Sequence, residues 1–584
     1  MILAGWSRQE IAFDADGYAM FGYGMWHHRA RGRQTPLHAR AVCLKDAGGT
    51  PLYFCLLDLG YVSHAVRDGV VAALRSRLDG FDESQLVLTC THTHSGPGGC
   101  SHEALYNVVT PGFNTQHFAA VVSAAATAVE TAARSIAPTD LALHEGRFAD
   151  DVEVAWNRSV HAHNRNPEVQ KRRPTETHLA INRGMRVLAL RREGKVQALV
   201  SFFGVHATAL GNTLERLDAD NKGYAARHAE AELLAQGASD PVAIFAQATA
   251  GDVSPHYHGP GQTRRRARLT GELEYAYAKQ NGERQGSCAL GIVAASDGAR
   301  IDGAIDAIFG YADFNCIAVD PRHAGGRTDA TTSEPCQGVA FFRGTPVDGP
   351  GVGSLLAGFA RMVAGFVKRR RLRQLSTYTP ERRAYYERVY AAQGTKAILL
   401  EAGGKTILGQ PLDKILLPDL VDPVIAELKR QVRIGAIVNS ELVPTVLPLQ
   451  IVRIGPLALV CVPGEFTTTA GARLEATVLE ILAARGVTTV QICTYCNDYM
   501  GYVTTNEEYQ AQAYEGGHTI YGQWTLGAFQ TRVAALATEL CKPAVSRTHD
   551  RTMRPPEVPA QELALRTDLP APGKRAPAQV TAGT

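Results

Sequence analysis

The 584-residue chain lacks three features that mark specialised classes of protein. No stretch approaches the roughly 18 apolar residues that a membrane-spanning helix needs. Its 60 Lys and Arg nearly balance 57 Asp and Glu, so a net charge of +3 gives no electrostatic reason to expect nucleic acid as a partner. Its 11 cysteines are odd in number and irregularly spaced, which does not suit a disulfide framework. These absences argue against an integral membrane protein, a nucleic-acid binder and a disulfide scaffold, and indicate a soluble folded chain.

The two ends of the chain also lack common features. The first ten residues, MILAGWSRQE, place Arg8 and Glu10 where the apolar core of a secretory signal peptide would continue, so we expect a cytoplasmic protein. Residues 551–584 are rich in Pro and Ala and contain no aromatic residue, a composition typical of disorder. We predict a globular part over residues 1–545 and a disordered tail over residues 546–584.

Short β-rich runs alternate with helical patterns through the globular part. Residues 86–90 form a compact apolar and β-branched run that enters the Gly/Pro loop THTHSGPGG. Asn114 is placed to cap a helix whose apolar residues recur at helical spacing. Because strands and helices interleave, the pattern favours an α/β fold of layered sheets and helices. Further strands are predicted over residues 198–205, 242–246, 451–462 and 487–493.

Polar side chains with catalytic or metal-binding chemistry follow several of these predicted strands. Strand-end loops of α/β folds commonly converge on a binding site. His92 and His94 are two residues apart, so on an extended segment both imidazoles point to one side, where one binds a metal and the other stays in reach. The remaining candidates are His206, Asp252, Ser254, Glu465 and Tyr502.

Each of these residues also has an ordinary structural explanation. A histidine that closes an apolar run, as His206 does, is more often a core residue than a ligand, and Glu465 suits the start of a helix. Tyr502 and Tyr514 resemble packing tyrosines. Ser254 follows a Gly-Asp turn and precedes proline, which suits a helix cap and differs from the G-x-S-x-G elbow of α/β-hydrolases. Taken one at a time, these residues leave both interpretations open.

Taken together, the motifs resemble the neutral ceramidase family, the non-lysosomal zinc amidases that cleave the N-acyl bond of ceramide. The resemblance covers about residues 1–545 and implies a single large catalytic domain of mixed β-sheets flanked by helices. The matching stretches are THTHSGPGG (91–99), LYNVVTPGF (105–113), NRS (157–159), VHATALGN (205–212), DNKGYA (220–225), GDVSP (251–255), GTPVDGPG (344–351), VPGEFTT (462–468) and YVTTNEEYQAQAYEGGHTIYG (502–522).

The resemblance also implies a set of functional residues. In the family one zinc ion is held by the first histidine of HTH, the histidine of VHxT, the glutamate of PGEFTT and the tyrosine that opens YxTT, which here are His92, His206, Glu465 and Tyr502. These nitrogen and oxygen donors suit Zn²⁺. The family mechanism is attack by zinc-bound hydroxide, with His94 as general base and with Arg158 and Tyr514 at the developing oxyanion. Ser254 is the nucleophile only in an alternative mechanism.

The chain departs from the family pattern in two places. Residues 352–445 diverge, and we expect this insert to shape the substrate entrance. It includes the basic run KRRRLR at 368–373, for which a solvated surface and a contact with an anionic membrane both stay open. Secreted relatives carry an N-terminal targeting segment and a C-terminal immunoglobulin-like domain. Neither is recognisable here, so we expect an intracellular relative.

The leading hypothesis is a zinc-dependent amidohydrolase with one Zn²⁺ per chain. It would cleave the N-acyl bond of ceramide, giving a sphingoid base and a fatty acid, or that of a related N-acyl lipid. One alternative is the same zinc hydrolase acting on a non-sphingolipid amide or ester, and another is a non-catalytic lipid or metabolite binder. A metal-free serine hydrolase built on Ser254 predicts activity that survives chelators. The expected partners are the small-molecule or lipid substrate and at most a peripheral membrane surface.

Overall fold

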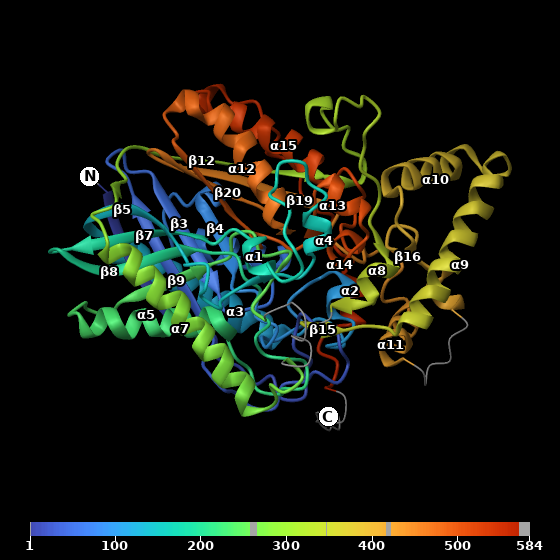
Figure 1. Cartoon of the computed structure of the whole chain (residues 1–584), viewed down its shortest axis with the longest axis horizontal. Helices are drawn as coiled ribbons and strands as arrows, with labels where there is room; N and C mark the ends of the chain where they lie inside the picture. Colours follow the sequence, from blue (N-terminus) through green and yellow to red (C-terminus); the bar gives the residue numbers. More distant parts are fainter. Residues whose placement is uncertain (1, 257–265, 346, 416–421, 572–584) are drawn as a thin grey trace, which may run out of the picture.

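Two β-sheets pack face to face between outer helices, which gives the fold four layers (Figure 1). The computed structural model describes residues 2–256, 266–345, 347–415 and 422–571. Within these ranges no helix combines the length and apolar character needed to cross a membrane. The layered α/β architecture expected from the interleaved strands and helices is confirmed.

The larger sheet is built from the first half of the chain, in the strand order β4-β3-β2-β1-β5-β7-β8-β9, with β11 beside β5. Most neighbours are antiparallel, but β3 with β4 and β8 with β9 are parallel pairs. The sheet is curved, because β9 at one end also contacts β1 and β2 in the middle. The strands are β1 (Ile2–Glu10), β2 (His38–Lys45), β3 (Pro51–Leu57), β4 (Leu86–Cys90), β5 (Ala137–Arg147), β7 (Gly184–Arg192), β8 (Lys195–Phe202), β9 (Val242–Ala246) and β11 (Ala299–Arg300).

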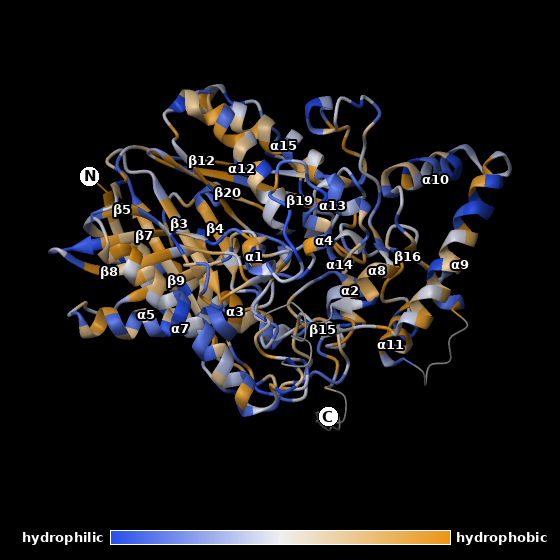
Figure 2. Cartoon of the chain, in the orientation of Figure 1, coloured by the Kyte–Doolittle hydropathy of each residue, from blue (hydrophilic) through white to orange (hydrophobic). Residues whose placement is uncertain are grey.

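The smaller sheet covers the inner face of the larger one. Its order is β12 (Ile305–Asp313), β19 (Val446–Ile454), β20 (Leu457–Cys461) and β22 (Thr489–Cys493). The strands of both sheets are largely apolar (Figure 2), as strands buried on both faces must be. The layer between the sheets includes Val42, Leu44 and Phe54 from the larger sheet and Val452, Ile454 and Leu459 from the smaller one.

Helices cover the outer faces of both sheets. Helix α3 (Thr115–Arg134) lies along β1 to β3 with α1 (His64–Arg75) beside it, and α5 (Asp220–Ala235) with α7 (Glu272–Ala294) covers the β7 to β9 end. Helices α12 (Thr468–Leu482) and α15 (Thr525–Leu540) cover the smaller sheet. The predicted cap of α3 is confirmed, because the Asn114 side chain accepts a hydrogen bond from the His117 amide at 2.9 Å.

The predicted strands agree with the structure to within a few residues. Runs 86–90 and 242–246 coincide with β4 and β9. The run 451–462 is the hairpin of β19 and β20, which turns at Gly455 as the Gly-Pro pair indicated. The run 198–205 overlaps β8, but the strand begins at Lys195 and ends at Phe202, ahead of His206.

Residues 352–415 and 422–433 form an outlying part at one side of the molecule, at the right of Figure 1. A small sheet joins this part to the body, in the order β13 (Cys336–Gly338), β16 (Ile398–Glu401), β17 (Thr406–Ile407) and β18 (Gln410–Pro411). Its helices are α9 (Ser354–Arg373), α10 (Pro380–Gln393) and α11 (Pro423–Arg433).

The C-terminal segment differs from the predicted disordered tail. Residues 546–571 pack on the body and include helix α16 (Ala560–Ala564), whereas residues 572–584 lie outside the described residues. The Glu562 carboxylate accepts hydrogen bonds from the backbone amides of Asn439 and Ser440, at 2.7 and 2.9 Å. Arg566 is fully buried, and its backbone oxygen accepts a hydrogen bond from the Phe113 amide at 2.8 Å. The prediction of disorder from composition does not hold for residues 546–571, because these tertiary hydrogen bonds offset the entropic cost of ordering a segment without aromatic residues.

Candidate active site

Two short parallel pairings bring four distant segments to one point. Thr93 pairs with Ala207 in an isolated parallel bridge, which places His92 and His94 beside His206. Strand β21 (Glu465–Phe466) pairs in parallel with β23 (Tyr502–Val503), and the register sets Glu465 directly opposite Tyr502. The curvature of the larger sheet makes this possible, since the loops after β4 and β8 come from opposite ends of its strand order.

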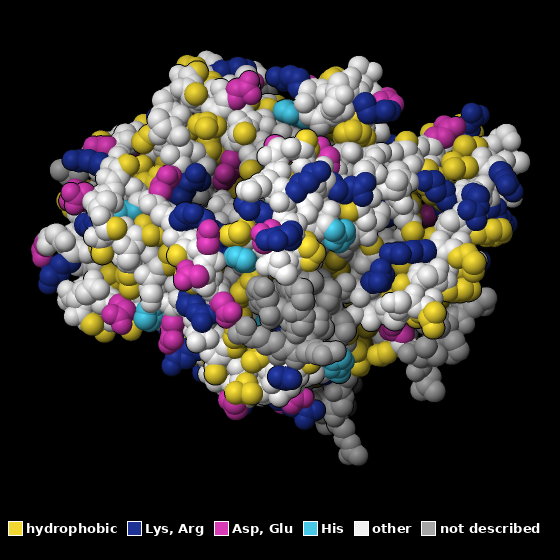
Figure 3. All heavy atoms as spheres, viewed as in Figure 1, with side chains coloured by type: hydrophobic (Ala, Val, Ile, Leu, Met, Phe, Trp, Pro, Cys, Tyr) yellow, Lys and Arg dark blue, Asp and Glu magenta, His cyan; other side chains and the backbone are white. Residues whose placement is uncertain are grey.

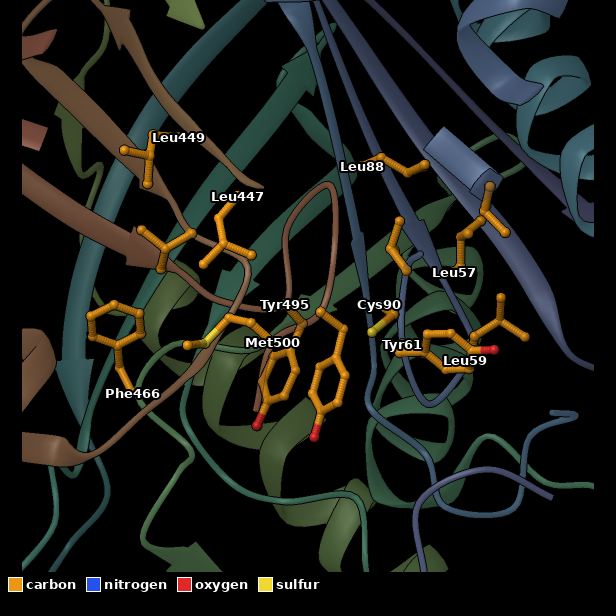
Figure 4. Close-up of a cluster of buried hydrophobic side chains, with 14 of the residues drawn as sticks. Leu57, Leu59, Tyr61, Leu88, Cys90, Leu447, Leu449, Phe466, Tyr495 and Met500 are labelled. Carbon is orange, nitrogen blue, oxygen red and sulfur yellow. The ribbon is translucent and has the colours of Figure 1, made fainter. Parts of the chain in front are cut away.

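A cluster of buried apolar side chains adjoins these segments along the chain (Figure 4). Its side chains come from β3, β4, β19 and the loops around them, and two of its members, Cys90 and Phe466, stand next to the site segments in sequence. The ring of Tyr495 stacks on the His92 imidazole with a centroid distance of 4.2 Å. His92 itself has a φ of +63°, an uncommon conformation for a histidine and one typical of functional sites.

Backbone carbonyls orient two of the histidines. The Nδ1 atom of His92 lies 2.5 Å from the Gly60 oxygen, and Nδ1 of His206 lies 2.6 Å from the Ala250 oxygen. An N–H at each Nδ1 donates to the carbonyl, so Nε2 carries the free lone pair. This second contact is typical of metal-binding histidines, because it fixes both the tautomer and the direction of the ring.

The donor atoms of four side chains have the spacing of a small tetrahedral metal site. Nε2 of His206 lies 2.9 Å from Oε2 of Glu465 and 3.2 Å from Oη of Tyr502. Nε2 of His92 lies 3.6 Å from the same carboxylate oxygen. Ligands bound tetrahedrally at about 2.0–2.1 Å stand about 3.3 Å apart, so these residues fit a zinc ion.

The charge states of His92 and Glu465 also fit a cation. Burial lowers the pKa of His92 to about 4, so its imidazole is neutral at pH 7. Burial alone would raise the pKa of Glu465, but His92, His206 and the hydrogen bond from Tyr499 lower it well below its usual range. Metal ligands must be neutral histidines and ionised carboxylates. The site therefore holds these residues ready for a metal.

His94 lies against this group but differs from the two other histidines. Its Nε2 is 3.3 Å from Nε2 of His92, and the three rings offer ligand atoms within 4.8 Å of one another. Among the described residues its Nδ1 has no hydrogen-bond partner, and its side chain is the most exposed of the three, at 9 %. Burial lowers its pKa, so the ring is neutral. A neutral, partly accessible imidazole without a fixed tautomer suits a proton acceptor better than a ligand.

Most N–H groups of the Arg158 guanidinium donate hydrogen bonds to other groups of the protein. Its Nε donates to Glu515 at 2.8 Å and its Nη1 to Asp348 at 3.0 Å. Its Nη2 donates to the Gly251 oxygen and to the Tyr502 hydroxyl, both at 2.8 Å. Four of the five guanidinium N–H groups are thus occupied. In this structure Arg158 positions Tyr502, and its role as an oxyanion donor stays a prediction.

Tyr514 is placed differently. Its ring lies 5.5 Å from that of Tyr502, and the Arg158 guanidinium lies 5.2 Å from its centroid. Burial raises its pKa, so the hydroxyl keeps its proton. The side chain is half-buried. Tyr514 therefore brings a protonated hydroxyl close to the metal-ligand group, and its role as an oxyanion donor stays a prediction.

The Ser254 hydroxyl is hydrogen-bonded to a carboxylate, not to a histidine or lysine. It lies on β10 (Val253–Ser254), fully buried, and its hydroxyl donates to Oδ1 of Asp348 at 2.6 Å. The Nε2 of His256 is 3.0 Å from the Thr208 oxygen, so this nearby ring is engaged elsewhere. A fully buried serine with no histidine or lysine bonded to its hydroxyl does not suit a nucleophile. Ser254 and Asp348 instead form a bridge to Arg158.

Asp252 belongs to a different buried group. Its Oδ1 accepts hydrogen bonds from the amide and hydroxyl of Thr468, at 2.8 and 2.9 Å, and its Oδ2 accepts one from Asn157 at 2.6 Å. It lies with His163 and Glu508, whose ligand atoms are within 4.8 Å of its own. The Asp252 carboxylate therefore ties the start of α12 to β6 (Trp156–Asn157).

Comparison with known families decides the classification. The profile of the family "Neutral/alkaline non-lysosomal ceramidase, N-terminal" matches residues 2–416 and 429–531. The chain belongs to this family. It is a hydrolase of the ceramidase type, which acts on linear amide bonds.

Curated ceramidases and solved structures agree with this classification. The chain is 31% identical to the neutral ceramidase of Pseudomonas aeruginosa over 545 residues, which is 92% of this chain and 72% of that protein. It is 31% identical to the neutral ceramidase of Mycobacterium tuberculosis over 556 residues, covering 92% and 77% of the two chains. A ceramidase solved as a complex with C2 superposes with a TM-score of 0.76 at 29% identity, covering 95% of this chain and 77% of that one.

The family match changes the view of residues 352–445. The profile continues through 416 and resumes at 429, so only residues 417–428 of this region fall outside it. The family match therefore extends over most of this region, and the expectation that it diverges and shapes the substrate entrance stays a prediction.

Several residues at the ceramidase site had no role in the sequence prediction. Tyr499 donates to Oε1 of Glu465 at 2.5 Å, and Tyr495 donates to Oε2 at 3.3 Å. Both lie in CTYCNDYMGY, just ahead of Tyr502, so their position in sequence was a usable signal. Asp348 lies in the motif GTPVDGPG (344–351), yet only the structure shows that its carboxylate joins Ser254 to Arg158.

Proposed function

We propose that this enzyme hydrolyses the N-acyl bond of ceramide or of a closely related N-acyl lipid, using one Zn²⁺ held by His92, His206, Glu465 and Tyr502. The observation that carries the proposal is the convergence of these four donors at 2.9–3.6 Å within a ceramidase fold. A zinc ion bound there supplies a Lewis acid that acidifies water and polarises a carbonyl oxygen.

The chain's own residues perform the proton transfers. His94, neutral and beside the ligand group, takes the proton of the attacking water at Nε2. It then returns that proton to the leaving nitrogen, so that water and amide give a carboxylic acid and an amine. The Tyr514 hydroxyl donates to the developing oxyanion.

Arg158 supports these steps through its neighbours. Its guanidinium donates to the Tyr502 oxygen and opposes the rise in pKa that burial imposes on that hydroxyl. Asp348 and Glu515 hold the guanidinium in place from either side. Ser254 acts through Asp348 and does not contact the reacting carbonyl, which favours the zinc mechanism over the serine alternative.

Metal analysis and a substrate panel test this proposal together. Purified protein should contain one zinc per chain, lose activity with a chelator and regain it with Zn²⁺. His94→Ala should keep the zinc and lose on the order of 10²–10⁴-fold in kcat, the usual contribution of a general base. His92→Ala should lose the zinc itself, whereas the exposed His161→Ala serves as the control that keeps both zinc and activity.

The panel should contain ceramide, short N-acyl amides and esters. Release of sphingoid base and fatty acid from ceramide is the expected result. Cleavage of another amide or ester with no turnover of any sphingolipid would establish the alternative hydrolase. Absence of zinc together with absence of turnover would establish a binding protein, and activity that survives chelation would establish a metal-free hydrolase. A cytoplasmic location stays a prediction, and cell fractionation would test it.

A further inference from the structure

Helix α9 has a narrow inner face made of small residues. Ala357, Ala360 and Ala364 are buried against the body, and the first two pack with Val339 in a small apolar cluster. Near its C-terminus Arg371 points inward as well and pairs with Glu401. These contacts fix one side of the helix and leave the opposite side turned outward.

The outer face carries large apolar side chains in solvent. Phe359 is 57% exposed, Met362 62% and Phe366 59%. Six of the thirteen large apolar side chains that are exposed in the described part of the chain lie on this one helix. Positions 355, 359, 362 and 366 are three or four residues apart, so they form one continuous stripe. A soluble protein rarely exposes such a stripe unless it binds something there. The other three exposed apolar side chains on α9 are Leu355, Leu356 and Leu372.

The same helix is strongly basic. It contains six cations and no acidic residue. Apart from Arg371, Lys368 alone bonds inward, to the Gly394 oxygen at 2.7 Å. The other four are exposed and form no ion pair with any described residue, and Figure 3 shows basic and apolar side chains together over α9. These four are Arg361, Arg369, Arg370 and Arg373.

The stripe begins close to the active site along the chain. Asp348, which contacts both Arg158 and Ser254, is seven residues ahead of Leu355. Seven extended residues span at most about 25 Å, so a surface that touches the stripe also lies near the site. The helix is therefore placed to influence how an amphiphilic substrate arrives.

We propose that α9 is an interfacial helix that docks the enzyme on an anionic lipid surface. The apolar stripe enters the boundary of headgroups and acyl chains, and the arginines pair with anionic headgroups. The charge disfavours the main rival occupant, a second copy of this chain, because two such helices would bring eight exposed, unpaired arginines together. This docking goes beyond the proposed amidase chemistry, since it concerns the surface on which the enzyme works.

Vesicle co-sedimentation tests the docking without any catalytic step. The probes are vesicles of pure phosphatidylcholine and vesicles with 30% phosphatidylglycerol, at low salt. The full chain should bind the anionic vesicles at least tenfold more tightly, and salt should weaken this binding. Reversing two arginines, R369E/R370E, should weaken it about 25-fold or more, at about fivefold for each cation lost.

The apolar stripe is tested by M362S/F366S, which should weaken binding to anionic vesicles at least tenfold. The matched control is L234S/L273S, because these side chains are 60% and 58% exposed on other helices. The control should bind as the unmodified chain does. Unchanged melting temperatures would show that all variants fold.

Three results would overturn the docking. The first is an unmodified chain that does not bind anionic vesicles, and the second is a stripe variant that binds as well as the control. The third is a dimer in light scattering that M362S/F366S abolishes, which would make the stripe a subunit interface. Hydrolysis of a short-chain substrate in solution should be equal in all variants, so failure of the docking and failure of the proposed amidase activity are separable.

Discussion

Replacing Gly22 by alanine should displace the His94 ring without removing any polar group from the site. An added Cβ at Gly22 would lie 2.3 Å from Cγ of His94, whereas carbon atoms normally approach to about 3.5 Å. The ring or the turn must therefore move by about 1.2 Å. Misplacing a catalytic group by about 1 Å costs on the order of 10²-fold in rate. We expect a loss of that size in kcat, with the zinc content unchanged because His94 is outside the proposed ligand set.

Gly24→Ala is the matched control for this experiment. Gly24 also has a positive φ, +63° against +121° for Gly22, but an added Cβ there meets nothing within 4 Å. Its cost should be confined to backbone strain of about 1–2 kcal/mol, visible in the melting temperature and not in kcat. Gly22→Ala protein that keeps zinc and more than about a third of its kcat would refute the argument that His94 must hold this position.

Three further predictions follow from single contacts. Tyr499→Phe removes the 2.5 Å hydrogen bond to Glu465 and should weaken zinc affinity about 10- to 100-fold in a competition titration; unchanged affinity would count against this support of the ligand. Ser254→Ala should keep its zinc and most of its activity, whereas complete loss with zinc bound would restore the nucleophile mechanism. Burial opposes ionisation of Glu562, but hydrogen bonds from Ser440 and Asn439 outweigh it and lower its pKa. The stabilisation is therefore present above the ordinary glutamate pKa and lost as pH falls through the lowered one. Glu562→Gln should weaken docking of the C-terminal segment by about 1–3 kcal/mol at pH 7, measured by amide exchange at Asn439 and Ser440; unchanged exchange would contradict it.

Local chemistry made the candidate residues visible in the sequence. His92, His206, Glu465 and Tyr502 each follow an apolar strand or a tight turn, and the order of the motifs matched one family. Their convergence could not be derived from strand patterns alone. It depends on the Thr93–Ala207 bridge and the pairing of β21 with β23, which join segments more than a hundred and about forty residues apart.

The misses have a common physical cause. The C-terminal segment was expected to be disordered from its composition, yet Glu562 and Arg566 order it by contacts with residues 439, 440 and 436. The hydrogen bonds of Arg158 to Glu515 and Gly251 were not foreseen either, while its role at the oxyanion stays a prediction. In both cases the partner lies far away in sequence, so no local pattern reports it.

The sequence by itself determined the layered α/β class and the family, and it supplied the candidate metal-binding residues, because these depend on side-chain chemistry and on periodicity along short segments. Only the tertiary structure decided which imidazole nitrogen faces the site, that Ser254 is held by Asp348, and that the apolar side of α9 is left uncovered. Tautomer, hydrogen-bond partner and exposure are properties of neighbours in space, and a linear pattern contains no information about which neighbours the fold will supply.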